Sequence, residues 1–298
     1  MRLRSVEVWI FLIVVLMCLP IVGQIAAAQN GAQPTPSGTH VVQLVGPNDS
    51  GFETALDTDF PGLSGVNYFQ AAKPLLVILH NPSPSAVRAY VVTWTVTNEA
   101  GDVSTANLPI IGEPETANYA LTGQNIVLGA GATELVSPFF HWTKRQFPGL
   151  MKINAVYILL QSASMRPLAA SVQNAATVHV ALDGDVFDDG VFIGPDASKL
   201  FERFQGEQQA EVDEGTWAVD QLSSSTTTEE IQQGLSQQIY EGRNATGTDS
   251  ASLYTAARGR EASRLLGVLD HSGRTALQIV ATRLSRAKPM TLSRQAGQ

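Results

Sequence analysis

The clearest pattern in the chain is an alternation of bulky and small or hydroxylated residues over 87–98. Four bulky residues share one face of an extended segment: Tyr90, Val92, Trp94 and Val96. Side chains of a strand point alternately to its two sides, so we predict a strand with this face buried. The opposite face carries three threonines, which we expect to point toward solvent.

Shorter apolar or alternating runs continue from residue 39 to about residue 192, and turn-forming residues separate them. We predict further strands over 41–45, 75–79, 103–108, 126–128, 133–136, 153–160, 177–182, 186–187 and 191–192. The last two flank Asp188-Asp189-Gly190, which is a strong hairpin signal. Residues 50–72 and 109–124 show no period, so we expect long connecting loops there.

The period of the apolar residues changes to three or four after Gly194-Pro195-Asp196. Asp196 or Ser198 can cap a first helix, and Thr228 opens a second with an apolar stripe. Residues 250–269 and 274–287 predict two more helices, interrupted at 270–273.

We therefore predict an α+β protein with an N-terminal immunoglobulin-like antiparallel β-sandwich over 39–194. An α-helical region of about four helices follows over 195–288, and a disordered tail over 289–298. The sandwich segment resembles the immunoglobulin- and fibronectin-like modules of bacterial exported proteins. In that resemblance Trp94 takes the place of the core tryptophan, whereas the cysteine pair of antibody domains is missing.

The N-terminus has the features of a signal peptide over 1–28. Two arginines precede an apolar run over 8–22, and small residues up to Ala28 form a cleavage site. The polar segment 29–38 then predicts a disordered tether. Cleavage removes Cys18, the single cysteine of the chain, and a cysteine-free exported chain suggests a bacterial periplasmic or extracellular protein. An uncleaved segment acting as a membrane anchor is the alternative.

Charge adds a further division of the chain. Only 15% of the 298 residues are charged and the net charge is −8, which argues against nucleic-acid binding. Residues 182–249 hold 15 acidic and 3 basic residues, whereas 250–298 hold 2 acidic and 8 basic. One interpretation is that basic helices pack against acidic ones within the molecule. The other is a basic surface that meets an acidic partner or anionic lipid.

Catalytic motifs are missing from the sequence. It contains no HExxH, no G-x-S-x-G and no Walker A motif, and none of its five histidines lies three or four residues from another. The most notable group is Asp183, Asp185, Asp188 and Asp189. Clustered carboxylates suit Ca²⁺, although Asp188 stands where an EF-hand requires glycine. Calcium is therefore the one candidate cofactor, and a simple hairpin explains the same residues.

Three functions are compatible with these observations. The first is a non-catalytic binding or structural module of the cell envelope or extracellular space, with a protein or envelope partner. The second is an exported hydrolase or carbohydrate-active enzyme that uses the carboxylates near 183–189. The third is an envelope assembly factor that uses the basic C-terminal helices. Contact with a membrane would come only through an uncleaved signal segment or weakly through these helices.

Overall fold

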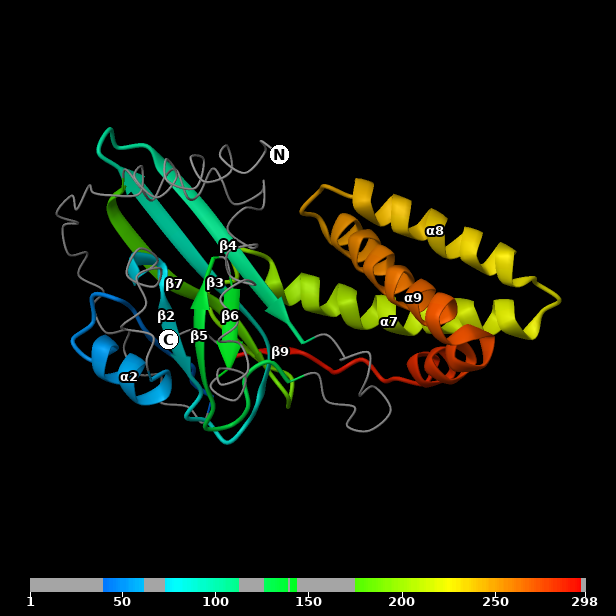
Figure 1. Cartoon of the computed structure of the whole chain (residues 1–298), viewed down its shortest axis with the longest axis horizontal. Helices are drawn as coiled ribbons and strands as arrows, with labels where there is room; N and C mark the ends of the chain where they lie inside the picture. The colour runs from blue at the N-terminus through cyan, green and yellow to red at the C-terminus, as the bar shows by residue number, and fades with distance from the viewer. Residues whose placement is uncertain (1–39, 62–72, 113–125, 139, 144–174, 296–298) are drawn as a thin grey trace, which may run out of the picture.

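The chain is described here by a computed structural model, which covers residues 40–61, 73–112, 126–138, 140–143 and 175–295. For 140–143 only the backbone is described. The predicted signal segment 1–28, the tether 29–38 and the predicted strand 153–160 lie outside these residues, as does the side chain of His141. The described residues form a mixed α+β protein, in which two sheets occupy one end and three helices the other (Figure 1).

Two sheets form the first part of the chain. In the first sheet the strand order is β1 (Gln43–Val45), β2 (Val77–His80), β5 (Thr133–Ser137) and β6 (Phe140–Thr143), all antiparallel. In the second the order is β4 (Val103–Ile111), β3 (Val87–Asn98), β7 (Ala175–Phe187), β8 (Val191–Ile193) and β9 (Ser293–Arg294). Only the pair β8–β9 is parallel among the pairs described in this sheet. We call these two sheets the two-sheet body.

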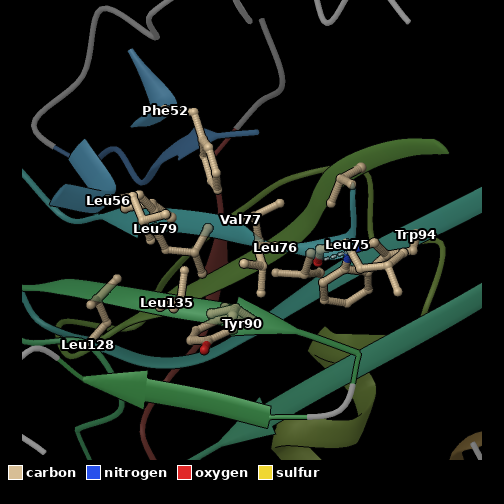
Figure 2. Close-up of a cluster of buried hydrophobic side chains, with 14 of the residues drawn as sticks. Phe52, Leu56, Leu75, Leu76, Val77, Leu79, Tyr90, Trp94, Leu128 and Leu135 are labelled. Carbon is tan, nitrogen blue, oxygen red and sulfur yellow. Dashed lines mark hydrogen bonds between the residues drawn. The ribbon is translucent and has the colours of Figure 1, made fainter. Parts of the chain in front are cut away.

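One hydrophobic core lies between the sheets, and its centre is the alternating strand β3 (Figure 2). Tyr90 and Trp94 are fully buried there, and the Trp94 indole donates at 3.0 Å to the carbonyl oxygen of Leu75, which lies just before β2. The prediction that the bulky face of residues 87–98 is buried is confirmed. The bounds of β3 also agree with the prediction.

Part of the segment expected to be a loop over 50–72 is helical. Helix α2 (Phe52–Asp59) buries Phe52 and Leu56 in the core, together with Phe60 just after it. The helix has no side-chain hydrogen bond at its N-terminus and a single acidic residue in its first turn. Its formation therefore depends on tertiary burial of its apolar residues, and a short segment of this kind carries little periodic signal.

The side of β3 opposite its bulky face is covered in the half of the strand near residue 89. Ala89 and Val91 lie on that side and are fully buried. They pack against the first turns of helix α7 (Leu200–Ser223), where Leu200 and Phe204 are buried too. The threonines further along are partly exposed. A helix that covers half of the outer face is a tertiary contact, which alternation along one strand does not reveal.

The helices α7, α8 (Thr228–Asn244) and α9 (Ser250–Ser285) pack together around a second core, and we call them the helical bundle. Helix α8 begins as predicted, with a capping box in which Thr227 and Glu230 bond to each other's backbone N–H groups. Helix α9 is interrupted at Gly273, where φ is 76° and ψ is −178°. This glycine ends the stretch 270–273 that the sequence marks as a break.

The C-terminal tail leaves the bundle and returns to the two-sheet body (Figure 1). Residues 289–298 were expected to be disordered, whereas the structure describes this segment as far as Gln295. Ser293 and Arg294 form β9 at the free edge of β8. The chain thus passes between its two parts twice, once through α7 and once through the tail.

Candidate functional site

The acidic hairpin at 183–189 does not gather its carboxylates around one point. Asp183 sits at an irregularity in the pairing of β7 with β3, and its carboxylate accepts from the backbone N–H groups of Ala197 (3.0 Å) and Ser198 (2.7 Å). It therefore holds the loop that leads into α7. Asp185 points instead to the inner face, opposite Tyr90 on β3.

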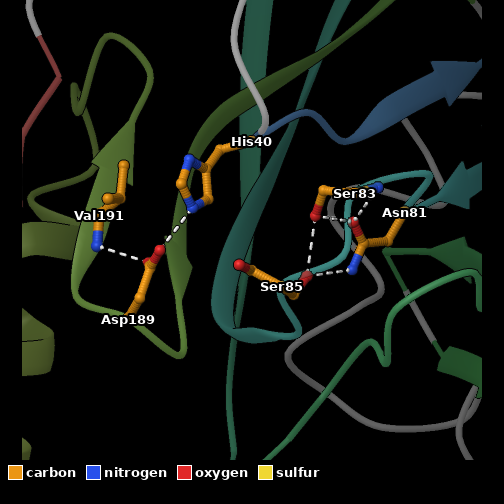
Figure 3. A network of polar contacts seen from close by, with 6 residues as sticks. All are labelled: His40, Asn81, Ser83, Ser85, Asp189 and Val191. Carbon is orange, nitrogen blue, oxygen red and sulfur yellow. Dashed lines mark hydrogen bonds and ion pairs between the residues drawn. The ribbon is translucent and has the colours of Figure 1, made fainter.

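The other two aspartates lie in the exposed turn of the hairpin. Figure 3 shows the Asp189 carboxylate between two partners: the His40 ring nitrogen Nε2 at 2.6 Å and the Val191 backbone N–H at 3.2 Å. Asp188 contributes an attractive charge to Arg88 of β3. In the part of the chain that the structure describes, no three His, Cys, Asp or Glu side chains are placed to hold a metal ion together. The calcium site at Asp183, Asp185, Asp188 and Asp189 stays a prediction.

Three histidines of the described residues lie at separate places. His80 ends β2, and its Nδ1 lies 3.2 Å from the Thr133 hydroxyl. His179 is exposed on β7. His271 makes a contact of 2.8 Å with a carbonyl oxygen of its own helix. These positions bring no two of the three histidines into one site.

A buried polar group lies between the two sheets. The Tyr90 hydroxyl donates to Glu134 Oε2 at 2.8 Å, and both residues are fully buried. Asp185 is 3% exposed, and its Oδ1 has no hydrogen-bond partner among the described residues. Burial raises the pKa of Asp185 well above its usual value. Burial, and next to it the charge of Glu134, raise the pKa of Tyr90.

The contact between α7 and α9 is a layer of opposite charges. Glu214 of α7 is fully buried and accepts from Arg258 Nε at 2.5 Å, and Glu207 pairs with Arg260. Burial raises the pKa of Glu214 and raises that of Glu261 to about 7. The interpretation in which basic helices pack against acidic ones is the one that these pairs show.

The most elaborate arrangement of side chains surrounds Arg294 of the tail. Its guanidinium carbon lies 5.0 Å from the ring centre of Phe192 and 4.4 Å from that of Phe201. Its Nη2 lies 2.5 Å from Asp196 Oδ2 and 3.5 Å from Glu202 Oε1. We call these four residues, two phenylalanines and two acids, the arginine seat. Aromatic faces and a carboxylate are the groups that attract a guanidinium most strongly.

Contacts that do not involve Arg294 also hold the residues of the arginine seat. Asp196 has a left-handed φ of 63°, which aspartate tolerates better than most residues. Its Oδ1 accepts from the Phe201 N–H at 3.1 Å, which leaves Oδ2 for the arginine. Phe192 and Phe201 meet edge to face at 5.5 Å. The side chain of Asp196 is only 3% exposed, whereas that of Arg294 is 46% exposed, so water reaches the pair from the arginine side.

Sequence reasoning missed this site because it treated the tail as disordered. One signal was available: after Pro289 the chain alternates Met290, Leu292 and Arg294 with small or polar residues. That is a strand pattern, but it is short and belongs to a strand only if a sheet edge is free to receive it.

Comparison with protein-family models, with curated proteins and with solved structures finds no match to this chain.

Proposed function

We propose that the chain is a non-catalytic structural or binding module of the cell envelope or extracellular space, which holds its helical bundle in a fixed position on the two-sheet body. The observation that carries the proposal is the path of α7. Its first turns are buried against the second sheet through Leu200 and Phe204, and the rest of the helix builds the bundle. Because one continuous helix packs into both cores, it fixes the position of the helical bundle relative to the two-sheet body.

The charged residues favour this function over the two alternatives. Asp183 and Asp196 organise the loop into α7, and Glu214 ties α7 to Arg258. Their contacts are those of a framework, so they lend the hydrolase alternative no support. Arg258 and Arg260 face α7 rather than a partner, which weakens the case for an assembly factor acting through basic helices.

The same proposal includes an immunoglobulin-like arrangement of the sheets and export from a bacterial cell. Support for the first comes from two sheets sharing one core around Trp94. Support for the second comes from the signal-like segment 1–28. In the described part of the chain, no helix combines the length and apolar character needed to cross a membrane.

Electron–electron distance measurements between spin labels test the fixed position of the bundle. Labels are placed on Val103 of β4 and Tyr240 of α8, whose side chains are 62% and 65% exposed, with Cys18 replaced by serine. Tyr240 and Ile279, both in the bundle, form the control pair. We expect the first pair to give one distance distribution as narrow as the control. A much broader distribution would mean that the bundle swings freely and would contradict the proposal.

Export is tested by the mass of the protein recovered from the cells that make it. A chain beginning at residue 29 and found in the periplasm or medium is the expected result. An intact N-terminus in the cytoplasmic fraction would contradict the proposed location.

A further inference from the structure

The tail binds to the two-sheet body in the way that a separate peptide adds to a sheet edge. The Ser293 N–H donates to the Gly190 carbonyl oxygen at 2.9 Å, and the Gln295 N–H donates to that of Phe192 at 3.0 Å. These are the main-chain bonds of a parallel strand pair. In such recognition the backbone bonds supply affinity and alternate side chains supply specificity.

Alternate residues of the tail contact the protein. The backbone N–H of Met290 is bound at 2.5 Å by the amide oxygen of Gln208, Leu292 packs against the core between α7 and the second sheet, and Arg294 fills the arginine seat. Thr291 and Ser293 between them are exposed. The edge of β8 and its surroundings therefore contact every second residue of the tail, at positions 290, 292 and 294.

The edge of β8 is also shaped to let a backbone approach. Gly190 adopts a φ of 89°, and a Cβ atom at this position would lie 2.2 Å from the Thr291 carbonyl oxygen. Only glycine leaves this space while taking that conformation. The hairpin turn of Asp188-Asp189-Gly190 thus forms one wall of the strand-binding edge, in addition to its role as a turn.

The tail is joined to the bundle by an exposed connection and adds only a short strand to the sheet. The strand β9 has two residues, and the preceding residues 286–289 are exposed. If the tail leaves, β8 presents unpaired backbone groups and an acidic aromatic pocket, which a segment of the same sequence satisfies best. Exchange between two copies would preserve every contact, as in domain swapping.

We propose that the edge of β8, with the arginine seat, is a strand-binding site that a second copy of this chain fills with its own residues 288–295. The occupant is named by the chemistry of the site: an extended segment with an apolar residue two positions before an arginine. The short connection favours binding within one molecule, because it holds the tail at a high effective concentration. Exchange of tails between two copies can therefore be detected in a variant whose own tail cannot bind its arginine seat.

The test uses two full-length variants, one with a defective tail and one with a defective seat. In Leu292→Asp/Arg294→Ala the tail is defective and the seat intact. In Asp196→Asn the tail is intact and the seat has lost its charge, while the asparagine oxygen can still accept from the Phe201 N–H. We expect each variant to be monomeric by sedimentation velocity, and an equimolar mixture to form a heterodimer. The control for the first variant is Arg286→Ala alone, in which Leu292 and Arg294 are unchanged. It removes an exposed charge elsewhere, and its mixture with Asp196→Asn should give no heterodimer.

A labelled peptide of sequence KPMTLSRQ, corresponding to residues 288–295, provides a second measurement. It should bind the defective-tail variant saturably, and a peptide with alanine in place of the arginine should bind at least tenfold more weakly. Equal binding of the two peptides, or none at millimolar concentration, would overturn the strand-binding site. Peptide binding without a heterodimer in the mixture would overturn exchange between copies. Circular dichroism of each variant shows that the fold is retained.

Discussion

Replacing Asp185 by asparagine should change how the stability of the protein depends on pH. The Asp185 carboxyl is buried between the sheets, and its Oδ1 has no hydrogen-bond partner among the described residues. Burial raises its pKa in the folded protein well above the usual range of an aspartate. Asparagine has nearly the same shape and does not titrate. Tyr90 faces Asp185 from the neighbouring strand β3, and its hydroxyl donates to Glu134 of the opposite sheet.

The sign and size follow from proton linkage. Below about pH 4 both the folded and the unfolded chain keep the Asp185 proton, so the group contributes its full stability there. As the pH rises, the unfolded chain releases the proton first. The free energy of unfolding then falls by about 1.4 kcal/mol per pH unit until the folded-state pKa is reached. Asp185→Asn should remove this loss, so the variant becomes the more stable protein as the pH rises.

Urea denaturation followed by tryptophan fluorescence between pH 4 and pH 8 measures the effect. The quantity to compare is the difference in unfolding free energy between wild type and variant at each pH. Other buried carboxyls with raised pKa values, such as Glu211 and Glu261, cancel in that difference. Asp188→Asn makes the same chemical change at an exposed position of the hairpin and is the control. If wild type and Asp185→Asn show parallel pH profiles, the reasoning about Asp185 is refuted.

Three further outcomes are expected, each measured by thermal or urea denaturation. Gly242→Ala should destabilise by about 1–3 kcal/mol, because the new Cβ would lie 2.6 Å from a glycine Cα of the facing helix; Gly267→Ala, with open space around it, should stabilise by up to about 1 kcal/mol. Arg258→Met should cost about 2–3 kcal/mol because it leaves a fully buried glutamate without its cation, whereas Arg260→Met, at a half-exposed pair, should cost less than about 1 kcal/mol. Equal losses for the two arginines would contradict the difference in burial. Millimolar calcium should leave the melting temperature unchanged, and a rise that is lost on neutralising the hairpin 183–189 would support a calcium site there.

Elements whose signals lie within one segment could be predicted from the sequence. The alternation over 87–98 contains both the extent of β3 and the face that enters the core. The capping box at Thr227 and the glycine break at Gly273 mark helix limits, because their hydrogen bonds and dihedral angles involve near neighbours only. These features depend only on residues that are close together in the sequence.

The candidate sites could not be predicted in the same way. Four aspartates within seven residues looked like one ligand cluster, but alternation along β7 and the irregularity at Asp183 send them to a loop, to the core and to the exposed turn. Spacing in the sequence says which carboxylates are near along the chain. Only the pairing of β7 with its neighbours decides where they point.

The charge division between 182–249 and 250–298 is a property of the sequence, and it made two interpretations possible. Packing of α7 against α9 selected the internal one for Arg258 and Arg260. The tail is the opposite case, since nothing within residues 289–295 stabilises a strand. The chain itself determined an alternation ending in arginine; the tertiary structure supplied the free edge of β8 and the acidic aromatic seat, because a strand exists only when another backbone completes its hydrogen bonds.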